Sequence, residues 1–108
     1  MTFDELLGQV QQSECQEVRT REDDYCEVVV TRTQLESVGA YLQSYFGIPF
    51  KPEGEQPGPE AMSYTKPYGG IFKDQVLYHR KNDRGVEMAL LWPWGGGDPV
   101  TLKIVRER

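Results

Sequence analysis

A run of β-branched and aromatic residues at positions 25–32 constrains the fold more than any other segment of this sequence. It contains three consecutive valines, Val28, Val29 and Val30, and side chains of this kind favour strands. Neighbouring side chains on a strand point to opposite faces of a sheet, so adjacent valines need apolar cover on both faces. The sequence therefore predicts a central strand here.

A segment with helical spacing follows this strand. Residues 34–46 repeat apolar side chains every three or four positions, and Gly47 and Pro49 supply the stop signal. Thr33 and Glu36 have the spacing of a capping box, in which a hydroxyl and a carboxylate close the first turn. We expect this helix to lie across the sheet.

The N-terminal residues predict a second, shorter helix. Thr2 and Glu5 repeat the capping-box spacing at the start of residues 3–12. The apolar stripe of this segment consists of Phe3, Leu6, Leu7 and Val10. Residues 13–24 are polar and strongly acidic, so we expect them to form a solvated connection rather than part of the core.

Residues 47–60 hold four prolines and three glycines, which predicts an irregular region. A structureless loop from residue 47 to residue 70 would be too long for a compact domain. We therefore expect a short strand near Ala61–Thr65 and a turn at residues 67–70.

The C-terminal part predicts a β-hairpin and a final strand. Strands at 74–81 and 86–92 flank the turn at 82–85, whose Asn and Gly suit a type I turn closed by a left-handed glycine bulge. Pro93 ends the second strand, and a glycine-rich loop leads to a last strand at 100–105.

The turn also predicts how the hairpin strands pair. A glycine bulge places Asn82 opposite Val86 and gives a favourable pair of Lys81 with Glu87. This register gathers Val76, Tyr78, Met88, Leu90 and Trp92 on one face. The alternative register, with Lys81 opposite Val86, mixes apolar side chains between the faces, so we expect the first.

Together these elements predict one α+β domain over residues 1–108, with two helices packed on a small, mainly antiparallel sheet of four to five strands. The expected order is α-β-α-(β)-β-β-β. The net charge of −5 argues against broad nucleic-acid binding, which needs a basic surface. The N-terminus lacks the features of a signal peptide, and no apolar run could span a membrane. We expect a cytoplasmic protein.

Motifs for metal or cofactor binding are missing from the pattern. Cys15 and Cys26 are too few, with the single histidine His79, to provide the four ligands of a structural zinc site. The glycines at 95–97 lead into a strand, whereas a phosphate loop leads into a helix N-terminus. We expect neither a metal ion nor a cofactor.

Aromatic residues beside glycine and proline give the strongest functional indication. Aromatic side chains supply contact area and are concentrated at recognition sites. The candidate binding residues are Tyr64, Tyr68, Phe72, Trp92 and Trp94. Our leading hypothesis is a non-enzymatic binding module, an accessory or regulatory protein that recognises another protein or a small ligand. The plainer alternative is that these rings cover the core beneath a long loop.

Two other function classes stay open. The first is a small enzyme or enzyme subunit with His79 as acid or base, assisted by a tyrosine hydroxyl or by Cys26. The second is nucleic-acid contact through the basic hairpin tip at 79–84, although charged tips are ordinarily only solvated. The final strand, or the short strand near residue 63, would also offer a sheet edge for pairing with a second copy.

Overall fold

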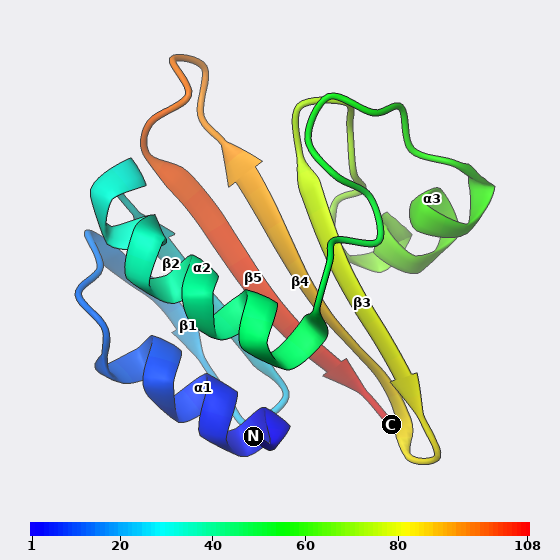
Figure 1. The fold of residues 1–108 in the computed structure, drawn as a ribbon, viewed down its shortest axis with the longest axis horizontal. Coiled ribbons are helices and arrows are strands. Elements are labelled where there is room, and N and C mark those ends of the chain that lie inside the picture. Colours follow the sequence, from blue (N-terminus) through cyan, green and yellow to red (C-terminus); the bar gives the residue numbers. More distant parts are fainter.

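The computed structural model describes all residues from Met1 to Arg108 and has an α+β fold built on a five-stranded antiparallel sheet (Figure 1). The elements in chain order are α1 (Phe3–Gln12), β1 (Glu17–Arg21), β2 (Tyr25–Val30), α2 (Arg32–Phe46), α3 (Pro59–Thr65), the 3-10 helix η1 (Lys66–Tyr68), β3 (Val76–Asn82), β4 (Gly85–Pro93) and β5 (Val100–Glu107). The strand order across the sheet is β1-β2-β5-β4-β3. The predicted fold class is therefore confirmed: the five strands lie within the expected four to five, and there is one α-helix more than the two expected.

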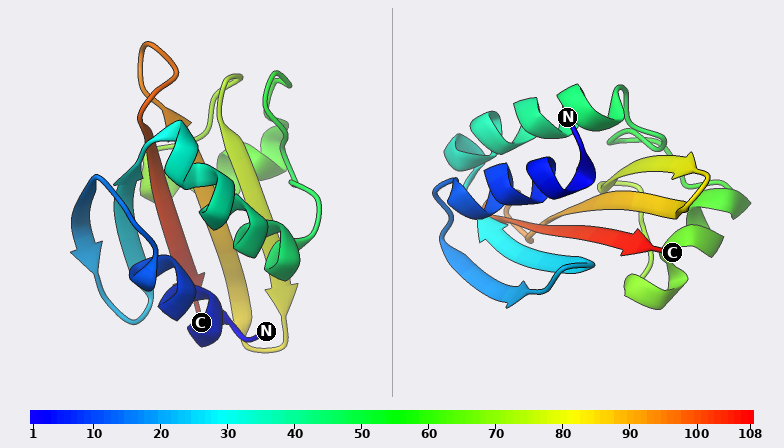
Figure 2. Two further views of the ribbon diagram at one scale, coloured as in Figure 1. Left: turned by 60° about the vertical axis from the view of Figure 1, so that its left-hand side comes forward. Right: turned by 90° about the horizontal axis from the view of Figure 1, so that it is seen from below.

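Helices α1 and α2 cover one face of the sheet, which we call the helical face (Figure 2, right). Their apolar stripes meet alternate side chains of β2 and β5 in the larger core cluster, which includes Leu6, Leu42, Val28 and Leu102. The stripe predicted for the first helix is buried in full. The amphipathic pattern alone was sufficient to place both helices on the sheet.

The start of α2 lies two residues before the predicted position. The Thr31 hydroxyl accepts a hydrogen bond from the Gln34 amide at 3.1 Å, and the Gln34 side chain accepts one from the Thr31 amide at 3.0 Å. This reciprocal pair is the capping box of the helix. The predicted box at Thr33 and Glu36 is wrong because Thr31, as the first residue after β2, already closes the first turn.

The opposite face of the sheet, which we call the second face, is covered only in part. Ala61 of α3 and Ile71 pack against the side chains of Leu77, Met88 and Leu90 in a smaller core cluster. Lys51 forms an isolated antiparallel bridge with Leu77 and so pairs with part of the open edge of β3. Strands β4 and β5 are therefore buried on both faces over much of their length, whereas β3 is buried only at Leu77 and Tyr78.

This double cover explains why the predicted hairpin register is wrong. Lys81 pairs with Val86 and Asn82 with Gly85, so the pairing is the alternative that face segregation disfavoured. Tyr78 belongs to the larger cluster on the helical face, whereas Leu77 belongs to the smaller one. Because an apolar cluster lies on each face, apolar side chains that alternate between the faces are not exposed to water.

Two short segments also differ from their predictions. The acidic segment 13–24 contains β1, an edge strand that pairs with β2 and has a register shift between Val18 and Thr20. The segment Ala61–Thr65 belongs to helix α3 and not to a strand, because Pro59 occupies a first-turn position where proline is well suited.

The edges of the sheet are β1 and β3, and β5 lies in the centre. The expectation that the final strand or residues near 63 form a free edge is therefore wrong. A bulge and charged side chains mark β1, and Lys51 covers part of β3, features that discourage edge-to-edge pairing. None of the helices combines the length and apolarity that a membrane span requires.

Candidate functional site

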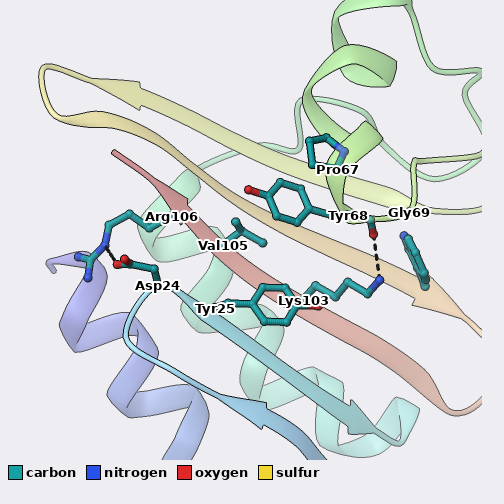
Figure 3. Close-up of a pocket in the computed structure, with 9 residues that line it drawn as sticks. Asp24, Tyr25, Pro67, Tyr68, Gly69, Lys103, Val105 and Arg106 are labelled. Atoms are coloured by element: carbon teal, nitrogen blue, oxygen red, sulfur yellow. Dashed lines mark hydrogen bonds and ion pairs between the residues drawn. The ribbon is translucent and has the colours of Figure 1, made fainter.

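The second face of the sheet is open beside η1, where no helix lies over β1 and β2 (Figure 2, right). A shallow groove of about 760 Å³ occupies this region, and we call it the aromatic groove. Its lining residues are Asp24, Tyr25, Pro67, Tyr68, Gly69, Trp92, Lys103, Val105 and Arg106 (Figure 3). They come from β2, η1, β4 and β5, so the groove exists only in the folded chain.

Two tyrosine rings form the most regular part of the groove. The ring centroids of Tyr25 and Tyr68 lie 6.4 Å apart with an interplanar angle of 15°, so the two rings are nearly parallel (Figure 3). The Tyr25 hydroxyl donates to Glu27 at 2.6 Å, and the Tyr68 hydroxyl donates to Glu107 at 2.7 Å. The two hydrogen bonds hold this nearly parallel, half-buried pair in place, and we call the pair the Tyr25–Tyr68 platform.

These contacts also hold both hydroxyls in the protonated form. Burial, reinforced by the carboxylate of Glu107, raises the pKa of Tyr68 to about 12. Burial and Glu27 raise the pKa of Tyr25 as well. The platform therefore keeps the same hydrogen-bonding state throughout the neutral range.

Lys103 lies against the ring of Trp92 in the same groove. Its ammonium nitrogen is 3.5 Å from the Trp92 ring centroid and donates to the Tyr68 carbonyl oxygen at 2.9 Å. Burial lowers the pKa of Lys103. A Cβ atom at Gly69 would overlap Cη2 of Trp92, so glycine is needed for η1 to approach this ring.

Ion pairs neutralise the arginines around the groove. Arg106 donates to Asp24 at 2.9 Å, and Arg19 of β1 donates to Glu17 at 2.9 Å and to Glu27 at 3.5 Å. Lys103 has its charge over the Trp92 ring instead. The groove therefore carries charged atoms without a strong excess of either sign.

The five predicted binding residues do not share one surface. Tyr68 and Trp92 line the aromatic groove. Trp94 lies further along the second face, where its indole donates to Thr101 at 2.8 Å. Tyr64 packs elsewhere against His79, and Phe72 is 64% exposed on the outer side of α3.

Phe72 borders a separate hollow of about 1000 Å³, which we call the apolar hollow. Met62, Pro57 and Pro59 also line it, and Met62 is 57% exposed. Gly69 lines both cavities, so η1 separates the apolar hollow from the aromatic groove.

His79 lies within a small aromatic cluster. Its ring stacks on Tyr64 at 4.1 Å and is 5.3 Å from the Phe50 ring. The Nε2 atom is buried without a hydrogen-bond partner, and burial lowers the pKa of the imidazole. Cys26 is buried in the larger core cluster on the helical face, so the pairing of Cys26 with His79 considered above is wrong.

The groove also contains two residues that the sequence analysis missed, Tyr25 and Lys103. Both had been assigned to the predicted strands but were given no role. Tyr25 pairs with Val105 across β2 and β5, so side-chain alternation from Val105 also places Lys103 on the second face. Strand alternation could have identified both residues once β2 and β5 were known to be neighbours.

A third hollow, of about 700 Å³, lies on the helical face near the hairpin tip. Glu87 is buried there and accepts a hydrogen bond from the Tyr45 hydroxyl. Glu87 pairs in register with Arg80 on β3 and with Arg106 on β5. Arg80 stacks over the Tyr45 ring with its Cζ atom 4.8 Å from the centroid.

No three His, Cys, Asp or Glu side chains lie close enough together to hold a metal ion. Comparison of the chain with family models, with curated proteins and with solved structures finds no match.

Proposed function

We propose that this chain is a small non-enzymatic binding module and that the aromatic groove is its recognition surface. The observation that carries the proposal is the Tyr25–Tyr68 platform, two nearly parallel, half-buried aromatic rings beside the part of the sheet that no helix covers. Aromatic rings that present contact area to solvent in a concave setting are typical of recognition sites.

The fixed geometry of the groove supports this proposal. Each tyrosine hydroxyl is anchored on a carboxylate, and Gly69 lets η1 seat against Trp92. A surface whose side chains are already ordered loses less conformational entropy on binding than a flexible one. The rings of the groove are therefore suited to receive a ligand without rearrangement.

The distribution of reactive groups supports a binding role over an enzymatic one. The aromatic groove has no histidine or cysteine in its lining. His79 lies instead in the Tyr64–Phe50 cluster, and it donates no hydrogen bond to a carboxylate that would orient its ring. Both cysteines have free thiols, which fits the reducing cytoplasm as the place of action.

Nuclear magnetic resonance with a fragment set tests the proposal. The probes are N-acetyl amino-acid amides, nucleosides and methyl glycosides, each added to the labelled full chain. We expect at least one class to shift the amide signals of Tyr25, Tyr68 and Lys103, and Tyr68→Ala to remove those shifts. Phe72→Ala, which removes an exposed ring outside the groove, is the matched control and should leave them unchanged.

Two results would contradict the proposal. Shifts that map to the apolar hollow or to the hairpin tip at 79–84 would place recognition elsewhere on the molecule. A complete absence of shifts from every probe class would mean that the platform is only a covering for the sheet.

A further inference from the structure

We infer that the ligand of the aromatic groove is an uncharged carbohydrate chain that stacks its ring faces on the Tyr25–Tyr68 platform. The inference rests on the proposed function, since it assigns a ligand class to the same groove. Three features support it: the nearly parallel rings of the platform, the mixture of donors and acceptors around it, and the pairing of its charges.

The nearly parallel rings of Tyr25 and Tyr68 favour a ligand with a flat face. The two rings are nearly parallel, so one flat ligand face can lie parallel to both of them. The face of an aromatic ring carries partial negative charge. The axial C–H hydrogens of a pyranose carry partial positive charge, so the ring face of a sugar suits this surface.

Hydrogen-bonding groups of both kinds border the platform. Lys103 uses one N–H on the Tyr68 carbonyl oxygen, and an ammonium group has three to donate. Asp24 is exposed at the rim, and Glu27 is half-buried beyond the Tyr25 hydroxyl. A sugar hydroxyl both donates and accepts, so it can use the lysine and the carboxylates together.

This mixture disfavours a proline-rich peptide. Aromatic grooves that bind such peptides offer donors to the backbone carbonyl groups, because proline has no N–H to donate. Carboxylates at the rim would remain unused by that ligand and would lose part of their hydration. The acceptors Asp24 and Glu27 therefore favour hydroxyl groups over proline carbonyls.

Charge pairing disfavours a polyanion. Arg106 is paired with Asp24, Arg19 is paired with Glu17 and Glu27, and the chain as a whole carries a net charge of −5. Nucleic acids bind through unpaired cations that displace counterions from phosphates. The carboxylates of Glu27 and Glu107 lie on the Tyr25 and Tyr68 sides of the platform and would repel a phosphate chain.

The distance between the carboxylates that flank the platform favours an oligosaccharide over a single sugar. Glu27 pairs in register with Lys103, and Glu107 lies four residues further along β5. At the usual rise of a strand this separation is about 13 Å. The platform and its two flanking carboxylates therefore span more than one sugar ring.

Titration with defined oligosaccharides tests the inference. The probes are cellohexaose, maltohexaose and chitohexaose, added to the full chain and followed by tryptophan fluorescence and by amide shifts. We expect at least one to bind with an affinity that does not change between low and high salt. Tyr68→Ala should weaken that binding by about tenfold or more, and Phe72→Ala should leave it unchanged.

A second variant separates loss of binding from loss of folding. Tyr68→Leu keeps an apolar side chain beside Gly69 but removes the flat ring, and thermal unfolding reports whether the fold persists. A folded Tyr68→Leu protein that binds the hexasaccharide as well as the parent chain does would overturn the inference.

The remaining outcomes distinguish this inference from the proposed function. Polyproline peptide or oligo(dT) shifting the groove signals while no hexasaccharide does so would refute carbohydrate as the ligand but preserve the aromatic groove as a binding site. Failure of all these probes, together with failure of the fragment set, would refute both proposals.

Discussion

The ammonium nitrogen of Lys103 sits 3.5 Å from the centroid of the Trp92 ring and also bonds to the carbonyl oxygen of Tyr68. One side chain on β5 thus joins β4 to η1 on the second face. Burial removes water from the ammonium group of Lys103 and so lowers its pKa. The contacts with the Trp92 ring and the Tyr68 carbonyl oxygen replace part of that lost hydration. The same contact supports the floor of the aromatic groove.

We expect Lys103→Met to reduce the free energy of unfolding by about 1–2 kcal/mol, because it removes a cation–π contact and a hydrogen bond. Urea denaturation followed by tryptophan fluorescence measures this loss. Lys81→Met is the matched control, since Lys81 is exposed at the end of β3, and it should change stability by less than about 0.5 kcal/mol. Equal effects of the two substitutions would show that the Lys103 contact contributes nothing.

Tyr45→Phe should reduce the free energy of unfolding by about 1.5–3 kcal/mol, because it deprives the buried carboxylate of Glu87 of its donor. Burial and the contact with Glu87 raise the pKa of Tyr45 to about 12, so the hydroxyl donates at every neutral pH. Chemical denaturation measures the change.

Glu87→Gln should be destabilising by about 1–3 kcal/mol, because it leaves the charges of Arg80 and Arg106 without the carboxylate between them. Glu14→Gln alters an exposed carboxylate with no ion pair and serves as the control in the same denaturation series. A Glu87→Gln protein as stable as the Glu14→Gln protein would contradict this account of the charged row.

Gly85→Ala should cost about 2 kcal/mol or more, because the new Cβ would overlap the Glu107 carbonyl oxygen and the residue has a φ of +142°. Gly95→Ala is the matched control, because nothing lies near a Cβ at that position. Thermal unfolding of the two variants should separate them clearly, and similar melting temperatures would argue against the observed hairpin register.

The stability of the chain should fall as pH drops below about 6.5 through the contribution of His79. Burial lowers the pKa of its imidazole, against a smaller opposing effect of Glu60 and a supporting one of Lys81. The unfolded chain therefore takes up a proton in a pH range where the folded chain resists it, which favours unfolding. Above that range His79 is neutral in both states and makes no pH-dependent contribution.

Urea midpoints at about pH 7.5 and about pH 5.5 measure this dependence. His79→Phe keeps a ring against Tyr64 but cannot titrate, so its loss of stability between the two pH values should be smaller than that of the parent chain. Equal losses would show that other groups account for the acid sensitivity.

Local patterns predicted the elements that depend on local chemistry. The stripe of α1, the stop of α2 at Gly47 and the interior position of β2 all follow from periodicity and turn residues. The hairpin register could not be predicted in this way, because it depends on whether one or both faces of the hairpin are covered. The cover of the second face comes from Ala61 of α3 and from Ile71, which are not adjacent to β4 in the sequence.

The site was predictable only in part for the same reason. Tyr68 and Trp92 were identified because they adjoin glycine or proline. Tyr25 and Lys103 meet them only through the pairing of β2 with β5, and residue type alone does not reveal which strands are neighbours. Tyr64 was assigned to the same surface, yet α3 turns its ring toward His79.

The central position of β5 has a consequence for how the chain acquires its structure. The β1–β2 pair and the β3–β4 pair share no strand contact, and residues 100–107 bridge them. During synthesis, the backbone hydrogen-bonding groups of β2 and β4 that pair with β5 therefore have no strand partner until residues 100–107 leave the ribosome. Because this closure joins segments distant in sequence, the assembled sheet forms late and cooperatively. Removal of residues 100–107 would leave the two hairpins with no strand pairing between them.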